Sequence, residues 1–218
     1  MTDVTRELAI FPLGSVLFPA MPLPLRVFEP RYVAMLSSVL AGAEREFGVV
    51  LIERGSEVGG GDVRFGVGTV ARIISVDESA GLIVLLATGG PRFEVVRWLQ
   101  DDPFPRAQVR ELAALELDES TPSQLASAEA VVRAAIAKAS EFVEPTWPAG
   151  VELSAELPQR IWQVAGIAPL NSLDQYALLR SRTVSELLGR LVEDTRAAEF
   201  LFTAGWGFDK QGDGDLPE

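Results

Sequence analysis

The sequence contains no cysteine and no histidine. Without cysteine there is no disulfide, no thiolate nucleophile and no zinc site with sulfur ligands. Without histidine the chain lacks the commonest general base, the commonest metal ligand and the usual catalytic triads. We therefore expect no metal site, no cofactor and no catalytic residue, and we expect that the protein is not an enzyme.

Lysine is nearly absent as well, because Lys138 and Lys210 stand against 17 arginines. Lys138 falls in a predicted helix and Lys210 in a Gly/Asp-rich tail, so neither suits the base of a Ser-Lys dyad. Neither lies in the GxxxxGK[ST] context of a P-loop. The net charge of −12 argues against nucleic acid, since phosphate binding draws on a surplus of Lys and Arg.

Long apolar runs are missing too. No run approaches the ~18 residues that span a bilayer, and the start, MTDVTREL, lacks the basic and apolar regions of a signal peptide. With 218 residues, 48% of them hydrophobic, the chain has room for one large domain or two small ones with buried cores. We expect a cytoplasmic protein without a membrane partner.

Proline is concentrated near the N-terminus. Residues 8–19 read as two short extended pieces hinged at Pro12 to Gly14. Residues 21–28 alternate as a strand does, with Pro22 and Pro24 on the same side. Because proline cannot donate to a sheet, this pattern predicts an edge strand.

The apolar period then changes from that of a strand to that of a helix. Pro30 suits the first helical position and Gly42 its end. The apolar positions that share one helix face are Tyr32, Met35, Leu36, Val39 and Leu40.

Strand patterns return over residues 47–112, separated by the turn signals GSEVGGGD, DESAG, GGP and DDPFP. Their spacing predicts an antiparallel meander that closes into a barrel or sandwich. The predicted strands are 47–53, 65–76, 82–89, 92–100 and 105–112.

Composition shifts near residue 115 to helical patterns. Thr121 to Gln124 form a capping-box start for a helix that reaches about Val143, and Thr183 to Glu186 start a strongly amphipathic helix. The predicted helices are 121–143, 154–165, 172–180 and 183–204. The prediction is an α+β fold with a β-rich half at 1–115, a helical bundle at 116–204 and a flexible acidic tail at 205–218.

Three other features have both a structural and a functional interpretation. The glycines at 59–61 and 66–68 could cradle phosphate, but hairpin turns explain them better without a lysine or a following helix. The adjacent acids Asp101 and Asp102 are typical of a solvated turn. The residues at the strand-to-helix corner are interpreted as a structural corner rather than a ligand clamp: Arg26, Glu29, Arg31 and Tyr32.

The four tryptophans are most simply core or inter-domain residues. Trp147 lies in a proline-containing loop and Trp206 in a glycine-rich tail, so these two are harder to place in a core. Exposed aromatic residues of this kind suit an interface.

With these patterns in view, PLGSVLFPAMPLPLRVFEPRYVAML resembles the signature of the Lon protease N-terminal, or substrate-binding, domain. FGVVLI, VGTVARI and TGGPRFEV follow in the family's order, although Phe104 stands where the family typically has tyrosine. DQYALLRSRTVSELLGRLVE is similar to the family's helix pair. The resemblance covers about residues 7–202 and implies a PUA-like pseudo-barrel with one inserted helix, followed by a helical bundle. It also implies a stand-alone domain without the ATPase and peptidase modules of a full Lon.

The resemblance implies a non-catalytic module that binds unfolded or tagged protein segments or a protease partner, and we expect it to act as an adaptor or regulator of proteolysis. A concave seam between the two halves is the expected site, with Met21, Leu23, Trp98 and Phe104 as candidate lining residues. Weak self-association through the strand at 21–28 is a further expectation. Two alternatives remain open, which are an enzyme that relies on carboxylates or arginines and an RNA-binding PUA-like protein.

Overall fold

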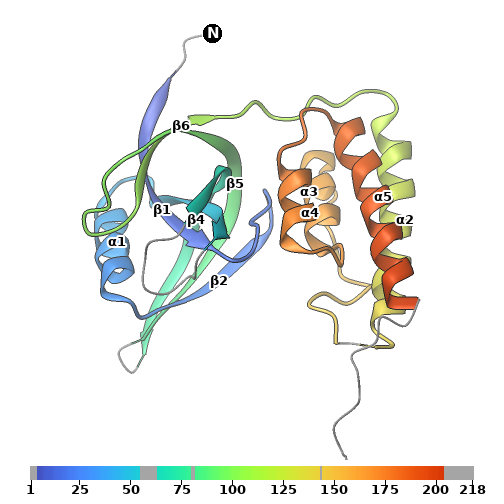
Figure 1. Cartoon of the computed structure of the whole chain (residues 1–218), viewed down its shortest axis with the longest axis horizontal. Coiled ribbons are helices and arrows are strands. Elements are labelled where there is room, and N and C mark those ends of the chain that lie inside the picture. The colour runs from blue at the N-terminus through green and yellow to red at the C-terminus, as the bar shows by residue number, and fades with distance from the viewer. Residues whose placement is uncertain (1–3, 55–62, 80–81, 143, 204–218) are drawn as a thin grey trace, which may run out of the picture.

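The computed structural model describes residues 4–54, 63–79, 82–142 and 144–203. All strands and one helix lie in the first part of the chain, and the other helices form a bundle beside them (Figure 1). This arrangement confirms the predicted α+β fold. The strands are β1 (Thr5–Leu13), β2 (Pro22–Val27), β3 (Glu46–Arg54), β4 (Val63–Ser79), β5 (Leu82–Trp98) and β6 (Arg106–Glu111), and the helices are α1 (Pro30–Ala41), α2 (Thr121–Ala139), α3 (Leu157–Ile167), α4 (Ser172–Leu179) and α5 (Val184–Thr203).

The sheet has the order β2-β5-β4-β3-β1-β6, and β5 also pairs with β6, which closes a barrel. The expected simple meander is wrong in one respect, because β1 lies between β3 and β6 and runs parallel to β3. The strand at 22–27 is at the sheet edge, as predicted. Its two prolines are exposed and offer no N–H to another strand.

The GGP segment is not a turn. The predicted strands 82–89 and 92–100 are one strand, β5, which pairs with β2 through Thr88 and with β6 from Phe93 onward. A Cβ on Gly89 would lie 2.1 Å from the carbonyl oxygen of Phe18. This glycine therefore allows a close approach between two chain segments and does not reverse the chain.

The predicted hinge at Pro12 is also misplaced, because β1 continues to Leu13. Residues 5–9 of β1 pair with β6, and residues 10–13 pair with β3. In the part of β1 that contains Pro12, only β3 among the described strands pairs with it. One side of the backbone is therefore free of ladder hydrogen bonds, and such a position tolerates proline.

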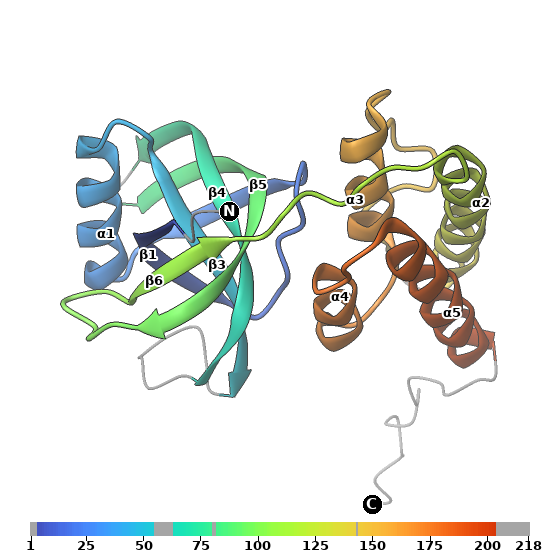
Figure 2. The ribbon, with the colours of Figure 1, turned by 90° about the horizontal axis from the view of Figure 1, so that it is seen from above.

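The inserted helix α1 begins at Pro30 and ends before Gly42, as predicted. Tyr32, Met35 and Leu36 are its buried side chains. The helix packs on the side of the barrel that faces away from the bundle (Figure 2). It therefore completes the barrel core and does not contribute to the seam between the halves.

In the bundle, α2 starts at Thr121 but not through the predicted capping box. The carboxylate of Asp118 accepts hydrogen bonds from the backbone N–H groups of Ser120 and Thr121, both at 2.9 Å. Thr121 itself is buried, and its hydroxyl accepts from the backbone N–H of Asp118 and donates to the Asp118 carboxylate, both at 3.0 Å. The helix ends at Ala139 rather than near Val143, which lies outside the described residues.

The start of α5 follows the prediction. The Thr183 hydroxyl accepts from the backbone N–H of Glu186 at 3.1 Å, and the Glu186 carboxylate accepts from the backbone N–H of Arg182 at 2.8 Å. These reciprocal bonds satisfy N–H groups that the first helical turn leaves unpaired.

One hydrophobic core passes through both halves, and it includes Phe18 and Met21 from the β half together with Ile161 and Leu187 from the helices. A smaller cluster around Phe93 fills the barrel. The halves are therefore packed on each other. The division at 115/116 stays a prediction, and the tail at 205–218 lies outside the described residues.

Candidate functional site

The seam between the halves is held by a buried arginine. Arg92 of β5 donates through Nη1 to the carbonyl oxygens of Leu179 at 2.8 Å and Ser181 at 2.7 Å. Through Nη2 it donates to the carbonyl oxygen of Ala113 at 3.2 Å. Leu179 is the last residue of α4, where helix carbonyls lack partners and the helix dipole favours a cation. Arg92 thus ties the barrel to the end of a helix and to the linker between the halves.

Two ring contacts and one further hydrogen bond also hold the seam. Phe18 stacks on Trp162 of α3, with ring centroids 5.9 Å apart, and Phe65 stacks on Tyr176 of α4 at 4.2 Å. Burial is the main cause that raises the pKa of the Tyr176 hydroxyl. The Gln163 side chain donates to the carbonyl oxygen of Ala20 at 3.2 Å.

The contact between α3 and the turn at residues 18–21 separates two cavities. On one side is a cavity of about 800 Å³, which we name the seam groove. It is formed by residues 15–18 and 21–24, the C-terminal part of α2, the loop at 144–147 and the connection between α3 and α4. Apart from Glu144, its lining residues are uncharged. The side chains that dominate it include Val16, Met21, Leu23, Ile136, Trp147 and Leu170.

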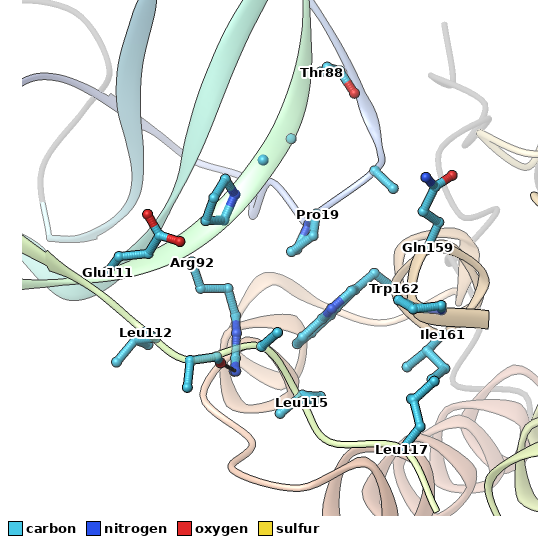
Figure 3. Close-up of a pocket in the computed structure, with 17 residues that line it drawn as sticks. Pro19, Thr88, Arg92, Glu111, Leu112, Leu115, Leu117, Gln159, Ile161 and Trp162 are labelled. Atoms are coloured by element: carbon cyan, nitrogen blue, oxygen red, sulfur yellow. Dashed lines mark hydrogen bonds between the residues drawn. The ribbon is translucent and has the colours of Figure 1, made fainter. Parts of the chain in front are cut away.

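On the other side is a cavity of about 520 Å³, which we name the Arg92 pocket. Its walls are β5 at Thr88 to Arg92, the linker after β6 and the first turns of α3. Figure 3 shows the side chains of Arg92 and Trp162 next to each other in its lining. The Cζ atom of Arg92 lies 4.9 Å from the centre of the Trp162 ring.

The structure brings together only part of the predicted peptide site. Met21 and Leu23 both line the seam groove, and so does Trp147, which the sequence had suggested for an interface. Trp98 lies elsewhere on the barrel, with the Arg64 guanidinium 5.2 Å from its ring centre. Phe104 is buried in the main core. Neither Trp98 nor Phe104 lines either cavity, and a peptide-binding role for Met21 and Leu23 stays a prediction.

The corner residues make contacts of a structural kind. Arg31 pairs with Glu29 at 3.2 Å and lies 4.5 Å over the ring of Tyr32. Tyr32 stacks on Phe11 at 4.1 Å. Arg26 is not part of this pair and is exposed on β2.

Several other candidates occupy ordinary positions. Asp101 pairs with Arg64 at 2.8 Å, and the glycines at 66 and 68 lie inside β4. Trp206 and the glycines at 59–61 lie outside the described residues. In the described ranges we find no group of three or more acidic residues arranged to hold a metal ion. Likewise, none of the described helices has the length and apolar character to cross a bilayer.

Sequence reasoning missed Arg92 and Phe18 as seam residues. Arg92 stands in the GGPRF segment and Phe18 in the LFP segment, so both were part of the resemblance. Their roles depend on Leu179 and Trp162, which are far away in the chain and carry no local signal of the contact.

A small barrel with an inserted helix, packed on a four-helix bundle, defines the class of protein. Residues 7–193 match the family described as the ATP-dependent protease La (LON) substrate-binding domain. The chain belongs to this family, which confirms the resemblance seen in the sequence.

Individual relatives agree with this assignment. The chain is 42% identical over 94 residues to the Lon protease of Magnetococcus marinus, a match covering 41% of this chain and 12% of that protein. The crystal structure of a Lon N-terminal domain protein from Xanthomonas campestris superposes with a TM-score of 0.62 at 26% identity, over 86% of this chain and 98% of that one. The N-terminal domain of Mycobacterium avium complex Lon protease has the same fold, with a TM-score of 0.62 at 16% identity over 88% and 98% of the two chains.

Proposed function

We propose that the seam groove binds apolar segments of unfolded or tagged protein, and that the chain serves proteolysis in the cytoplasm as a non-catalytic adaptor or regulator. The observation that carries this proposal is an open cavity of about 800 Å³ with a largely apolar lining at the seam. Its size lies within the roughly 300–1,000 Å³ of typical ligand sites. Membership of a substrate-binding family supports the same conclusion.

The groove has an adaptable wall. A Cβ on Gly166 would come within 2.7 to 2.8 Å of the Met21 side chain, so glycine there leaves room for the methionine. Methionine is unbranched and polarisable, and it repacks against side chains of different shape. Met-rich or flexible surfaces are typical of proteins that accept many partners. We therefore expect the groove to select apolar character rather than one sequence.

The adjacent sheet edge favours side-chain packing over strand addition. Pro22 and Pro24 both line the groove, and both lack the N–H that a docked strand would require at those positions. A bound segment would thus gain most of its affinity from buried apolar area.

Two neighbouring residues of β5 provide a matched test. Leu86 and Val84 are 37% and 40% exposed, but only Leu86 lines the groove. A short fluorescent peptide rich in Leu and Phe is titrated with the protein and followed by anisotropy. Leu86→Asp is expected to weaken binding by about tenfold or more, because a carboxylate is costly in an apolar contact. Val84→Asp is expected to bind like the wild type. Equal affinity of the two variants would overturn the assignment of the groove.

A further inference from the structure

Arg92 carries a positive charge that no carboxylate in the described ranges neutralises. The residue is 6% exposed, and its hydrogen-bond partners are three backbone carbonyl oxygens. Carbonyl oxygens carry partial charges, so a buried guanidinium surrounded by them keeps an uncompensated formal charge. In agreement with this, burial lowers the pKa of Arg92 below its ordinary value.

The guanidinium also retains hydrogen-bonding capacity. It has five N–H donors, and its bonds to Leu179, Ser181 and Ala113 use three of them. Nη2 keeps one N–H, and Nε has no recorded partner. Nε of Arg92 is not fully buried. Among the described residues, the fully buried side-chain atoms without a hydrogen-bond partner are Arg106 Nε, Ser181 Oγ and Thr195 Oγ1. Nε and Nη2 lie on the same edge of the guanidinium, the edge that holds a carboxylate in a two-pronged arrangement.

The surroundings of Arg92 suit a ligand with an apolar body. Figure 3 shows the Trp162 ring beside the guanidinium, with Pro19 on one side and Leu115 on the other. Leu117 and Ile161 continue the wall toward the bundle. The cavity of about 520 Å³ falls in the range of small-molecule sites, roughly 300–1,000 Å³.

Glu111 is the acidic residue in the lining of this pocket. In Figure 3 its carboxylate lies near the backbone end of the Arg92 side chain, away from the guanidinium. It makes no ion pair with Arg92. Glu111 is therefore not the counterion of Arg92. Its negative charge would, however, repel a carboxylate bound nearby.

We propose that the Arg92 pocket binds a carboxylate attached to a small apolar body, with the carboxylate on Arg92 and the apolar body against Trp162, Ile161 and Leu115. This site lies on the opposite side of the turn at 18–21 from the seam groove, and it does not depend on the function proposed for the groove. The ligand chemistry is that of an apolar amino-acid residue with a free C-terminal carboxylate, or of a free organic acid of similar size.

The first experiment compares two probes that differ only at the C-terminal group, which is a carboxylate in one and a neutral amide in the other. N-acetyl-Leu-Phe with a free carboxylate and the corresponding C-terminal amide are titrated into ¹⁵N-labelled protein. The indole N–H signal of Trp162, assigned with Trp162→Phe, reports on the pocket. The free acid is expected to bind about tenfold or more tightly than the amide and to shift the Trp162 signal. Equal affinities, or a shift confined to the Trp147 signal, would overturn the proposal.

The variants of the second experiment are at exposed positions rather than at the buried Arg92, so that a change in affinity does not reflect a loss of folding. Glu111 and Leu117 are both exposed. Glu111→Gln is expected to tighten binding of the acid by about twofold, because it removes a like charge. Leu117→Asp is expected to weaken it several-fold, whereas the groove variant Leu86→Asp leaves it unchanged. If Glu111→Gln and Leu117→Asp shift the affinity in the same direction, or if Leu86→Asp weakens it, the proposal that this pocket recognises a carboxylate is wrong.

A second pair of probes separates the two sources of the carboxylate. N-acetyl-phenylalanine stands for a free acid, and a longer peptide that ends in Leu-Phe stands for a polypeptide terminus. Equal affinity supports a small organic acid as the ligand, and a clear preference for the peptide supports a chain terminus. If neither probe moves the Trp162 signal, the proposal fails while the groove proposal remains untouched.

Discussion

The two cavities share one seam but differ in what surrounds them. The seam groove is bordered by loops and helix ends, with Met21 and Trp147 among its side chains and Glu144 as its charged residue. The Arg92 pocket is bordered by a continuous strand and the linker, and the buried guanidinium of Arg92 is part of its lining. Adaptable apolar packing on one side and a fixed charge on the other indicate different ligands. The difference shows that one interface between two halves can form two cavities with chemically distinct linings.

The largest expected effect comes from removing the charge that holds the seam. Arg92→Met keeps the length of the side chain but leaves the carbonyl oxygens of Leu179, Ser181 and Ala113 without their donor. We expect the free energy of unfolding to fall by about 3 kcal/mol, measured by urea denaturation.

The matched control is Arg97→Met, on the same strand but with an exposed side chain. We expect it to change the free energy of unfolding by no more than about 0.5 kcal/mol. If Arg92→Met were as stable as this control, apolar packing alone would hold the seam, and the contrast between the cavities would lose its structural basis.

A smaller effect is expected on the groove side. The Glu129 carboxylate accepts from Arg160 and from Arg133, both at 2.8 Å, and Arg133 donates to the carbonyl oxygen of Val151 at 3.0 Å. This network steadies the loop that carries Trp147. The hydrogen bond from Arg160 is the main cause that lowers the pKa of Glu129, and the bond from Arg133 adds to it against the opposing effect of burial.

Because the folded-state pKa of Glu129 lies below its unfolded value, its contribution to stability is present above the unfolded pKa of about 4.3. That contribution is lost as the pH falls through the folded-state value. Glu129→Gln should therefore lower the free energy of unfolding by about 1 kcal/mol at pH 7, with the difference shrinking in acid. Urea titrations at neutral and acidic pH measure this, with Glu116→Gln, exposed in the linker, as the control. A difference that is independent of pH would mean that packing rather than charge explains the loss.

The smallest effect concerns the turn that separates the cavities. Ala20 has a φ of 59°, in the left-handed region that costs a non-glycine residue about 1 kcal/mol. Its backbone is held there because its N–H donates to the carbonyl oxygen of Gly89 at 2.8 Å and its own carbonyl accepts from Gln163. Ala20→Gly relieves the strain, and the greater freedom of glycine in the unfolded chain offsets part of the gain.

We expect Ala20→Gly to raise the free energy of unfolding by about 0.5 kcal/mol, measured by urea denaturation. Ala114→Gly in the exposed linker should instead lower it by a similar amount. If the two variants changed stability equally, the turn would hold no strain between the cavities.

Local patterns predicted most elements but not the places where distant segments set the structure. Pro30 and Gly42 delimit α1 as expected, because capping and proline effects act within one turn. The GGP segment was misread as a turn because the reason for Gly89 is the backbone of Phe18, far away in the chain. Thr121 was misread as a cap for a similar reason, since Asp118 takes that role and Thr121 is buried.

The sequence by itself determined the two kinds of half, the edge strand with its prolines, the bundle and the family, because these depend on short-range periodicity and on contiguous motifs. Only the tertiary structure decided which residues meet at the seam. Met21 reaches the space left by Gly166, and Arg92 reaches the end of α4. Both contacts require the barrel and the bundle to be packed on each other, so the groove and the pocket exist only in the folded chain.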